Sequence, residues 1–464
     1  MRMIVEQSAQ GGIEWDGPQL QHCTGTRNAC KLCTPLGACL AFRGIEGSVP
    51  FLHGSQGCST YIRRYLISHF REPMDIASSN FHEESAIFGG SSNFRTGIRN
   101  VVRQYQPAFL GVATTCLAET IGEDMPGIIH QLRSETPDLP PLVHVSTASY
   151  RGTHIDGFHA AVRATIEQLA FAGVRTNRLN VLPGMVSAED LRHLKEILEE
   201  FGINFVLLPD YSETMDGGTW ERYQPIQPGG TRLQAIGGMG GSRGTVEFGT
   251  VFGTTPTGGA VLEEKFGVPL TRLVHPCGIR QTDAFFGMLE RFTERPTPEK
   301  FRTQRARLID AYIDGHKYVF QKRAIVYGEE DLVIALTSFL QEIGIEPVLC
   351  ASGGRSGRFE SALRAAVPDL PKSTRIREGF DFAEIAEAAP ALAPDLLVGS
   401  SKGYQIARRL GVPLVRVGFP IHDRVGGHRI LHLGYRGAQR LFDEIVNTIM
   451  EQKQTASEIG YAYL

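Results

Sequence analysis

The sequence contains no long hydrophobic run, because no stretch reaches the roughly 18 uninterrupted apolar residues of a membrane span. The N-terminal stretch MRMIVEQSAQGGIEWDG also lacks the apolar segment of an export signal. The net charge is only −3, from 47 basic and 50 acidic side chains, so the basic excess typical of nucleic-acid-binding chains is missing. These absences predict a cytoplasmic protein with neither a membrane nor a nucleic acid as its partner.

Several catalytic motifs are also missing. The sequence has no G-x-x-x-x-G-K-[ST] phosphate loop, no G-x-S-x-G elbow and no H-E-x-x-H zinc motif. Residues 228–260 are rich in glycine and threonine, but GGMGGSRG does not fit the G-x-G-x-x-G pattern of dinucleotide-binding loops. A flexible turn is therefore the better interpretation of this stretch, and its role stays open.

The chain is long enough for several domains, since 464 residues exceed what one hydrophobic core usually supports. Short apolar runs alternate with helical patterns, which is typical of buried parallel strands in an α/β fold. We expect an N-terminal arm at residues 1–22, a first α/β domain at 23–175 and a second at 176–297. A third α/β domain is expected at 298–464, ending in a C-terminal helix.

Eight cysteines in a chain of this kind favour metal or redox chemistry over disulfides. Cys58 follows the apolar run VPFL, Cys116 follows FLGVA, and Ser149 follows LVHV. Ligands of open α/β sheets bind beyond the carboxyl ends of the strands. The three positions are therefore expected to meet at one edge of the first sheet.

Cys33 is a candidate ligand for a different reason, because it precedes a predicted helix and does not follow a strand. It precedes Thr34 and Pro35, which we expect to be an N-cap and the first residue of a helix. The positive end of a helix dipole favours a thiolate. A lone cysteine is ordinarily a small buried hydrophobe. Three that share such a context suit an iron–sulfur cluster better than a disulfide.

Cys30 and Cys33 also form a CxxC pair, which has two further interpretations. It could be a thioredoxin-like dithiol, or one half of a zinc site. No second pair of ligands occurs at zinc-like spacing, and TGTRN before the pair is not a strand. Both interpretations are less favoured, and the role of Cys30 stays open.

Several motifs together resemble the β chain of the nitrogenase component 1 family. They include LCTPLGA, HGSQGCSTY, SHFREP, AIFGGSSN and TTCLAETIGED, and the similarity runs from about residue 30 to residue 445. The resemblance implies three Rossmann-like α/β domains with mostly parallel sheets. It also implies an oxidoreductase subunit that pairs with a homologous α-type chain, usually as an α2β2 tetramer.

The resemblance assigns Cys33, Cys58 and Cys116 as ligands of an eight-iron P-cluster-type cluster shared with the α-type chain. Ser149 matches a serine that ligates the oxidised cluster in some members. Tyr61 matches a tyrosine on the electron path to a substrate-reducing iron–sulfur cofactor held by the partner. No catalytic residue would then lie in this chain.

Phe88, in AIFGG, matches an apolar residue at the docking face for an ATP-driven iron protein. That partner binds transiently in the family and hydrolyses ATP, which agrees with the missing phosphate loop here. The chain would thus relay electrons between the iron protein and the partner's cofactor.

The sequence departs from the dinitrogenase pattern at two places. The Asn-Pro usually found before the first cysteine is replaced by TRNACKL, and the long N-terminal extension of many molybdenum-type β chains is missing. These departures slightly favour a methylthio-alkane reductase, which cleaves C–S bonds, over the β chain of molybdenum dinitrogenase. A cofactor-assembly scaffold is a third alternative, and Cys116 argues against it because such scaffolds usually lack the third cysteine.

Overall fold

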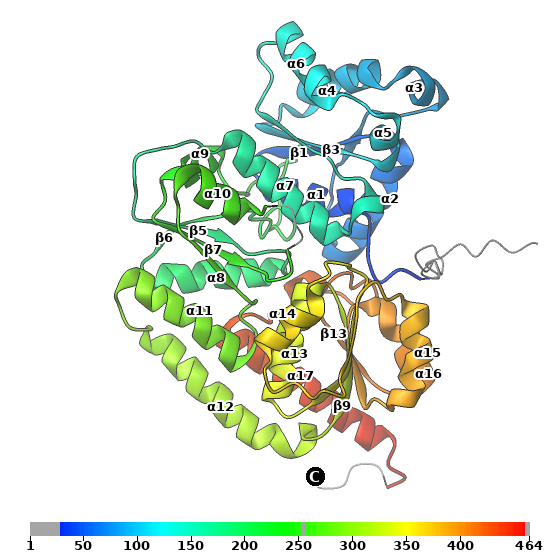
Figure 1. Cartoon of the computed structure of the whole chain (residues 1–464), viewed down its shortest axis with the longest axis vertical. Coiled ribbons are helices and arrows are strands. Elements are labelled where there is room, and N and C mark those ends of the chain that lie inside the picture. The colour runs from blue at the N-terminus through cyan, green and yellow to red at the C-terminus, as the bar shows by residue number, and fades with distance from the viewer. Residues whose placement is uncertain (1–27, 253–255, 460–464) are drawn as a thin grey trace, which may run out of the picture.

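The computed structural model describes residues 28–252 and 256–459, so the expected arm at 1–22 lies outside the described residues. The described chain contains three parallel β-sheets with helices packed against them (Figure 1). We call each sheet with its surrounding helices the first, second and third unit, in chain order. This architecture confirms the expected α/β fold.

The first unit has a four-stranded sheet with the order β2-β1-β3-β4. Its strands are β1 (Ser48–His53), β2 (Ala77–Ser78), β3 (Phe109–Thr114) and β4 (Leu142–Val145). Its helices are α1 (Thr34–Arg43), α2 (Gln56–Phe70), α3 (Glu83–Phe88), α4 (Ser91–Tyr105), α5 (Cys116–Ile121), α6 (Met125–Glu135), the short 3-10 helix η1 (Ser149–Arg151) and α7 (His154–Leu169). β1 and β3 are wholly buried, which explains why both read as continuous apolar runs.

The second unit has a four-stranded sheet with the order β6-β5-β7-β8. Its strands are β5 (Arg178–Leu182), β6 (Asn204–Leu207), β7 (Gly244–Phe248) and β8 (Leu270–Leu273). Its helices are α8 (Ala188–Glu200), α9 (Leu233–Gly237), η2 (Gly238–Gly241), α10 (Gly258–Phe266) and α11 (Gly278–Thr293). α8 begins with a capping box in which Ser187 and Asp190 bond to each other's backbone N–H.

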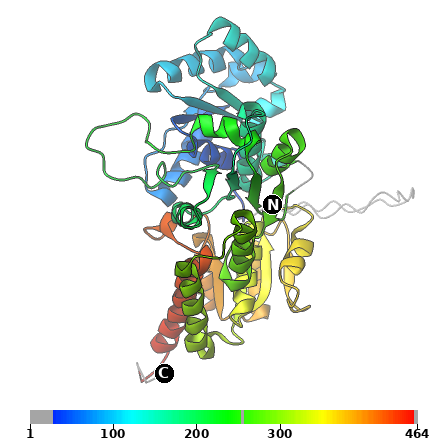
Figure 2. The same ribbon diagram turned by 90° about the vertical axis from the view of Figure 1, so that its left-hand side faces the viewer.

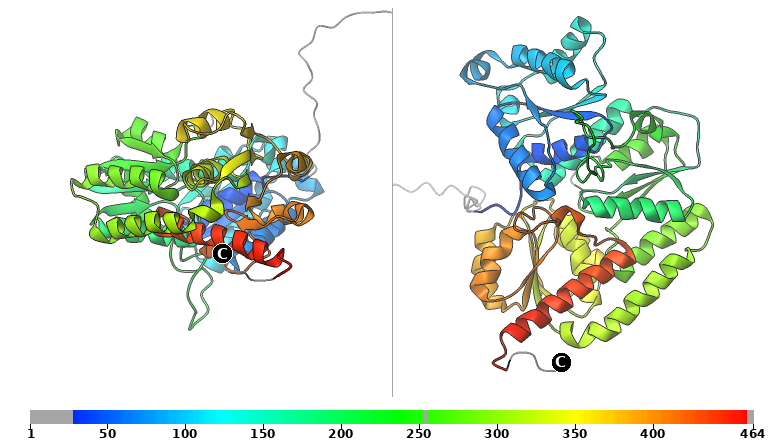
Figure 3. Two further views of the ribbon diagram at one scale, coloured as in Figure 1. Left: turned by 90° about the horizontal axis from the view of Figure 1, so that it is seen from below. Right: turned by 180° about the vertical axis from the view of Figure 1, so that it is seen from behind.

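The third unit has a five-stranded sheet with the order β11-β10-β9-β12-β13. Its strands are β9 (Arg323–Gly328), β10 (Glu346–Ser352), β11 (Arg375–Arg377), β12 (Leu396–Gly399) and β13 (Leu414–Arg416). Its helices are α12 (Glu299–Val319), α13 (Glu330–Glu342), α14 (Phe359–Ala366), α15 (Phe382–Leu392), η3 (Ser401–Gly403), α16 (Tyr404–Leu410), η4 (Gly427–Arg429) and α17 (Gly434–Thr455). α17 is the expected closing helix, and it packs along α12 (Figure 3).

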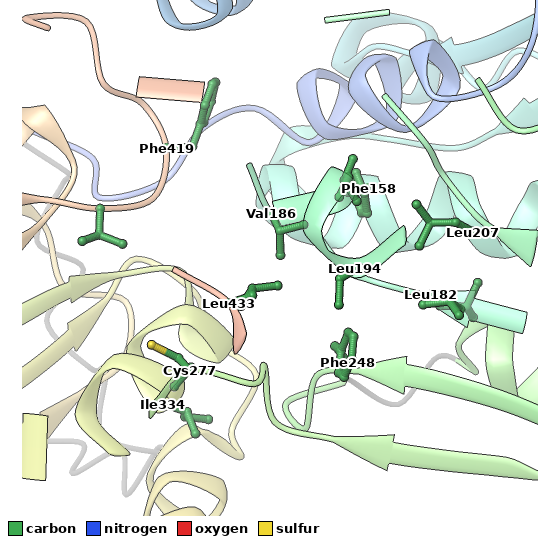
Figure 4. Close-up of a cluster of buried hydrophobic side chains, with 14 of the residues drawn as sticks. Phe158, Leu182, Val186, Leu194, Leu207, Phe248, Cys277, Ile334, Phe419 and Leu433 are labelled. Carbon is green, nitrogen blue, oxygen red and sulfur yellow. The ribbon is translucent and has the colours of Figure 1, made fainter. Parts of the chain in front are cut away.

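All three units contribute to one continuous core. Figure 4 shows side chains that converge from the three units, and each of those labelled is less than one-tenth exposed. They are Phe158, Leu182, Val186, Leu194, Leu207, Phe248, Cys277, Ile334, Phe419 and Leu433. Burying a large apolar side chain stabilises a fold by about 1.5–3 kcal/mol, so this junction ties the units together.

The glycine- and threonine-rich stretch at 228–260 is more ordered than the sequence predicts. The expectation of a flexible turn is wrong for much of it, because it contains α9, η2 and the fully buried strand β7. Gly240 and Gly241 lie against the backbone at Phe171 and Val174, closer than a Cβ would allow. Close backbone packing, not mobility, therefore accounts for part of the glycine content.

The boundaries of the expected domains stay a prediction. The strands of the three sheets fall at 48–145, 178–273 and 323–416, inside the ranges expected for the three domains. The segment that joins β6 to α9 projects from the body of the molecule (Figure 2). Among the helices of the described residues, none is both long and apolar enough to cross a bilayer.

Candidate metal centre

The carboxyl ends of β1, β3 and β4 lie side by side in the first sheet. β1 pairs with β3 up to His53 and Thr114, and β3 pairs with β4 up to Ala113 and Val145. The three strands are parallel, so the residues that follow them emerge at one edge of the sheet. Cys58, Cys116 and Ser149 come shortly after these ends, as the sequence predicts.

The turns after β1 and β3 are in direct contact. A Cβ added to Gly54 would lie only 1.9 Å from Oγ1 of Thr115, so glycine is required for this approach. The Thr115 N–H also donates to the carbonyl of His53 at 3.0 Å. The contact places the first turn of α2, with Cys58, beside the start of α5, with Cys116. α2 begins at Gln56, so Cys58 itself is a helical residue.

Two of the sulfur atoms accept hydrogen bonds within the unit. The backbone N–H of Ser149 donates to Sγ of Cys116 at 3.2 Å. The Ser55 hydroxyl lies 3.6 Å from Sγ of Cys58. Hydrogen bonds to sulfur stabilise thiolate character and tune iron–sulfur centres. The structure thus brings Cys116 and Ser149 together directly.

Cys33 lies at the N-terminus of α1, one position closer to the helix than the sequence predicts. Thr34 is the first helical residue and Cys33 itself is the N-cap, so the expected Thr34 cap is wrong by one position. The Cys33 side chain makes no capping hydrogen bond. α1 packs closely on α7 and also contacts η1, which begins at Ser149. Cys33 is therefore on the same side of the first unit as Ser149.

The packing of α1 on α7 depends on two glycines. A Cβ on Gly37 would lie 1.7 Å from the carbonyl oxygen of His154, and one on Gly157 would lie 1.9 Å from that of Thr34. Backbones can approach this closely only where side chains are missing. The starts of the two helices are thereby fixed against each other.

The described cysteines fall into two groups. Cys33 is exposed and Cys58 and Cys116 are half-buried, whereas Cys39, Cys277 and Cys350 are buried. Burial raises the pKa of the Cys350 thiol to about 12. Thiols of the second group are therefore protonated hydrophobes, and the first group holds the accessible sulfur atoms.

Cys30 belongs with the buried group in its chemistry. The residue as a whole is half-exposed, but its side chain packs against the core of the third unit. Burial is the main cause that raises the pKa of the Cys30 thiol to about 12, and the nearby Glu329 carboxylate adds to the shift. The packing of the side chain against this core sets the environment of the thiol.

Tyr61 and Phe88 both point away from the core. Tyr61, in α2, is 67% exposed, and Phe88, the last residue of α3, is 85% exposed. No packing role explains large side chains that are this accessible. Their parts in electron transfer and docking stay predictions.

Sequence reasoning missed two residues behind Cys33. The ring of His154 is buried, bonds the N–H of Leu32 and pairs with Glu329 of the third unit. A histidine in GTH and a glutamate in YGEE carry no pattern that would join residues so far apart. In residues 28–252 and 256–459, no three His, Cys, Asp or Glu side chains are grouped closely enough to hold a single metal ion.

Comparison with known proteins gives a consistent result. The family described as nitrogenase component 1 type oxidoreductase matches residues 33–450. The nitrogenase molybdenum-iron protein beta chain of Clostridium pasteurianum is 34% identical over 429 residues, covering 92% of this chain and 93% of its own. That of Methanothermobacter marburgensis is 35% identical over 437 residues, covering 92% and 94%.

The solved structures agree with the sequence comparison. A chain of the structure titled "Nitrogenase Cp1 at pH 6.5" superposes with a TM-score of 0.91 and 32% identity. The superposition covers 96% of this chain and 98% of that one. A chain of "Nitrogenase Cp1 at pH 5" shares the fold at 16% identity, with a TM-score of 0.68.

Proposed function

The chain belongs to the family of nitrogenase component 1 type oxidoreductases, and we propose that it is the β-type subunit of a nitrogenase-like reductase. The observation that carries the proposal is a set of three cysteines, Cys33, Cys58 and Cys116, which are not fully buried and stand at the starts of helices α1, α2 and α5 of the first unit. Membership of the family implies iron–sulfur clusters. The β-type assignment is supported by relatives that are themselves beta chains.

The cysteines fit an iron–sulfur cluster in their chemistry. Thiolates are the soft ligands that such clusters require. The Cys116 sulfur already accepts an N–H bond from Ser149, and the exposed Cys33 leaves room for ligands from another chain. Cys33, Cys58 and Cys116 would hold one half of a P-cluster-type cluster, and a homologous α-type chain would supply the other ligands.

When bound, such a cluster supplies one-electron transfer. Cys33, Cys58 and Cys116 would bind it and orient it. The hydroxyl of Ser149 is the one oxygen of this set that could become an additional ligand. Tyr61 would lie on the path towards the partner's substrate-reducing cofactor.

The exposed ring of Phe88 would meet the ATP-driven iron protein. A phenylalanine that is 85% exposed forms a ready contact for a transient partner. The sequence has no phosphate loop, which agrees with ATP hydrolysis in that separate protein. The assembly would be an α2β2 tetramer that binds the iron protein transiently.

Two substrates are consistent with this role. The names of the relatives favour dinitrogen. The departures at TRNACKL favour a thioether, whose C–S bond would be cleaved by reduction. The pocket that selects the substrate would lie in the α-type partner.

The test is anaerobic co-purification with the α-type partner. We expect a brown complex with iron well above one atom per chain, which reduces substrate only with ATP and the iron protein. Dinitrogen and a volatile thioether assayed in parallel then decide the substrate. A colourless, iron-free complex that still reduced substrate would overturn the proposal, and transfer of a cofactor without sustained turnover would identify a scaffold instead.

A further inference from the structure

The segment that leads into α1 lies on the third unit, although α1 itself belongs to the first. The N–H of Phe382 donates to the carbonyl of Asn28 at 2.8 Å, and Ala29 forms an antiparallel bridge with Asp381. Nζ of Lys402 donates to the carbonyl of Ala29 at 3.4 Å. These contacts come from α15 and η3, on the carboxyl side of the third sheet. The approach to Cys33 is therefore anchored by a different unit from the one that holds Cys58 and Cys116.

Cys30 is the apolar part of this anchor. Its side chain packs against the core cluster that contains Tyr327 and Phe382. A Cβ on Gly353, after β10, would lie 2.5 Å from the carbonyl oxygen of Cys30, so the two backbones are in contact. A thiol kept protonated by burial is a poor metal ligand and a good hydrophobe.

His154 and Glu329 form the second anchor, directly behind Cys33. The N–H of Leu32 donates to Nδ1 of His154 at 3.3 Å. Since Nδ1 accepts this bond, the ring proton lies on Nε2, which donates to Oε1 of Glu329 at 2.9 Å. The imidazole is only 3% exposed, so water competes little for either bond.

His154 and Glu329 both lie at the starts of helices, which fixes their positions. His154 is the first residue of α7, and a capping box between Thr153 and Asp156 holds that start. Glu329 is the N-cap of α13, at the end of β9. It also lines a cavity of about 30 Å³ beside His69 and His432, where the three units meet. A cavity of that size has room for water at the second carboxylate oxygen.

We propose that the third unit positions Cys33 for cluster binding, with Cys30 as an anchor and not a ligand, and with His154 and Glu329 as positioning residues. The inference rests on the proposed function, because it concerns how one ligand segment is presented. It adds that correct packing of the third unit on the first is a condition for the cluster site. None of the four anchoring side chains (Cys30, His154, Glu329 and Lys402) would touch substrate.

The test uses substitutions of His154 that each keep only one of its two hydrogen bonds, to Leu32 or to Glu329. Asn at position 154 can still accept from Leu32 but cannot reach Glu329, and Gln can reach Glu329 but not Leu32. In full-length protein, we expect His154→Ala and His154→Gln to speed amide exchange at Leu32 by about tenfold, because its hydrogen bond is lost. His154→Asn should give a smaller increase. Glu329→Gln keeps an acceptor and should come closest to the native rate.

Alkylation of Cys33 in iron-free protein gives a second readout that does not depend on activity. A loosened segment should react faster in His154→Gln than in the native chain. His193→Ala is the matched control, since His193 is also buried and paired with a glutamate, Glu196, at 2.9 Å. Exchange at Leu32 that is unchanged in His154→Gln, or raised equally in His193→Ala, would overturn the inference.

Cys30→Ala separates the anchor from a ligand. We expect iron content to stay at the native level in the anaerobic complex, while exchange across residues 29–33 increases. Loss of iron with native exchange would show that Cys30 is a ligand and would overturn its part in the inference. Failure of the proposed function would show differently, as iron retained in Cys33→Ala, and would leave the exchange results intact.

Discussion

The first and third sheets are both parallel but carry different chemistry at their carboxyl edges. In the first unit the residues after the strands are Cys58, Cys116 and Ser149, and none of them is fully buried. In the third unit β9 is followed by Glu329 and Glu330, each held by partners inside the protein. The topology therefore offers an edge in both units, and side-chain chemistry decides which edge can bind a cluster.

The edge of the third sheet is closed by its own hydrogen bonds. Oε1 of Glu330 accepts from the N–H of Ser356 at 3.2 Å, and the hydroxyl of Tyr327 donates to the carbonyl of Ser400 at 2.6 Å. Burial raises the pKa of Glu330 to about 7. This edge is thus an internally hydrogen-bonded surface, which suits an anchor for the Cys33 segment.

The difference between the two edges is tested most directly by removing a sulfur atom at the carboxyl edge of the first sheet. Cys58→Ala should abolish cluster binding and activity together, because a thiolate ligand is lost. Cys350→Ala, in β10 of the third unit, should keep its iron and lose only about 1–2 kcal/mol of unfolding free energy. Iron per chain and ATP-dependent reduction in the anaerobic complex are the measurements. Native iron in Cys58→Ala would remove that residue from the ligand set.

Thiol labelling of iron-free protein sharpens the contrast between the two groups of cysteines. A thiol whose pKa is about 12, such as Cys350, is about one ten-thousandth thiolate at pH 8. Its alkylation should rise about tenfold per pH unit up to that pKa. The exposed Cys33 should react much faster than Cys350 at pH 8.

Mass spectrometry of the labelled peptides at several pH values measures these rates. Loading with iron should protect Cys33, Cys58 and Cys116 and leave the slow rate of Cys350 unchanged. Equal labelling of all four cysteines at pH 8 would contradict the division into accessible and buried groups.

The carboxyl edge of the first sheet could be predicted from the sequence, because the pattern that indicates it is local. Apolar runs end just before Cys58, Cys116 and Ser149, and parallel strands necessarily end at a common edge. The resemblance then identified the family, which the comparisons show. The N-cap of α1 is Cys33 and not the predicted Thr34, and a difference of one residue is within the ordinary scatter of helix ends.

The anchor of Cys33 could not be predicted, because it depends on long-range contacts. His154 meets Glu329 across 175 positions of sequence, and Phe382 meets Asn28 across an even longer separation. No periodicity or spacing records such pairs. The stretch at 228–260 was misread for a related reason, since glycines that permit close packing have the same composition as glycines in a loop.

Glu330→Gln tests whether the Glu330 carboxyl, at the edge of the third sheet, is as shielded from water as its burial indicates. The pKa of Glu330 is raised from 4.5 to about 7 in the folded chain, mainly by burial. Between these values the unfolded chain loses its proton and the folded chain keeps it, so stability falls as pH rises from about 4.5 to 7. The group should therefore cost about 2–3 kcal/mol at pH 8 relative to pH 4.

Glutamine does not ionise and should abolish this contribution. Urea unfolding at pH 5 and pH 8 measures it, and the variant should be the more stable protein at pH 8. Its Oε1 can still accept from Ser356, so the hydrogen bond is kept. An identical pH dependence in both proteins would mean that Glu330 is hydrated and that the two edges are less different than described.

The smallest expected effect concerns Phe88, which lies at the end of α3 in the same unit as the first edge. Phe88→Ala should leave iron content unchanged and alter unfolding by no more than about 0.5 kcal/mol, because the ring is 85% exposed. Its loss should raise the concentration of iron protein needed for half-maximal rate about tenfold, as expected for an aromatic contact. Val174→Ala, 88% exposed in the segment between α7 and β5, is the control and should leave that concentration unchanged. An equal shift in both variants would show that exposure alone, and not the position of α3, explains the effect.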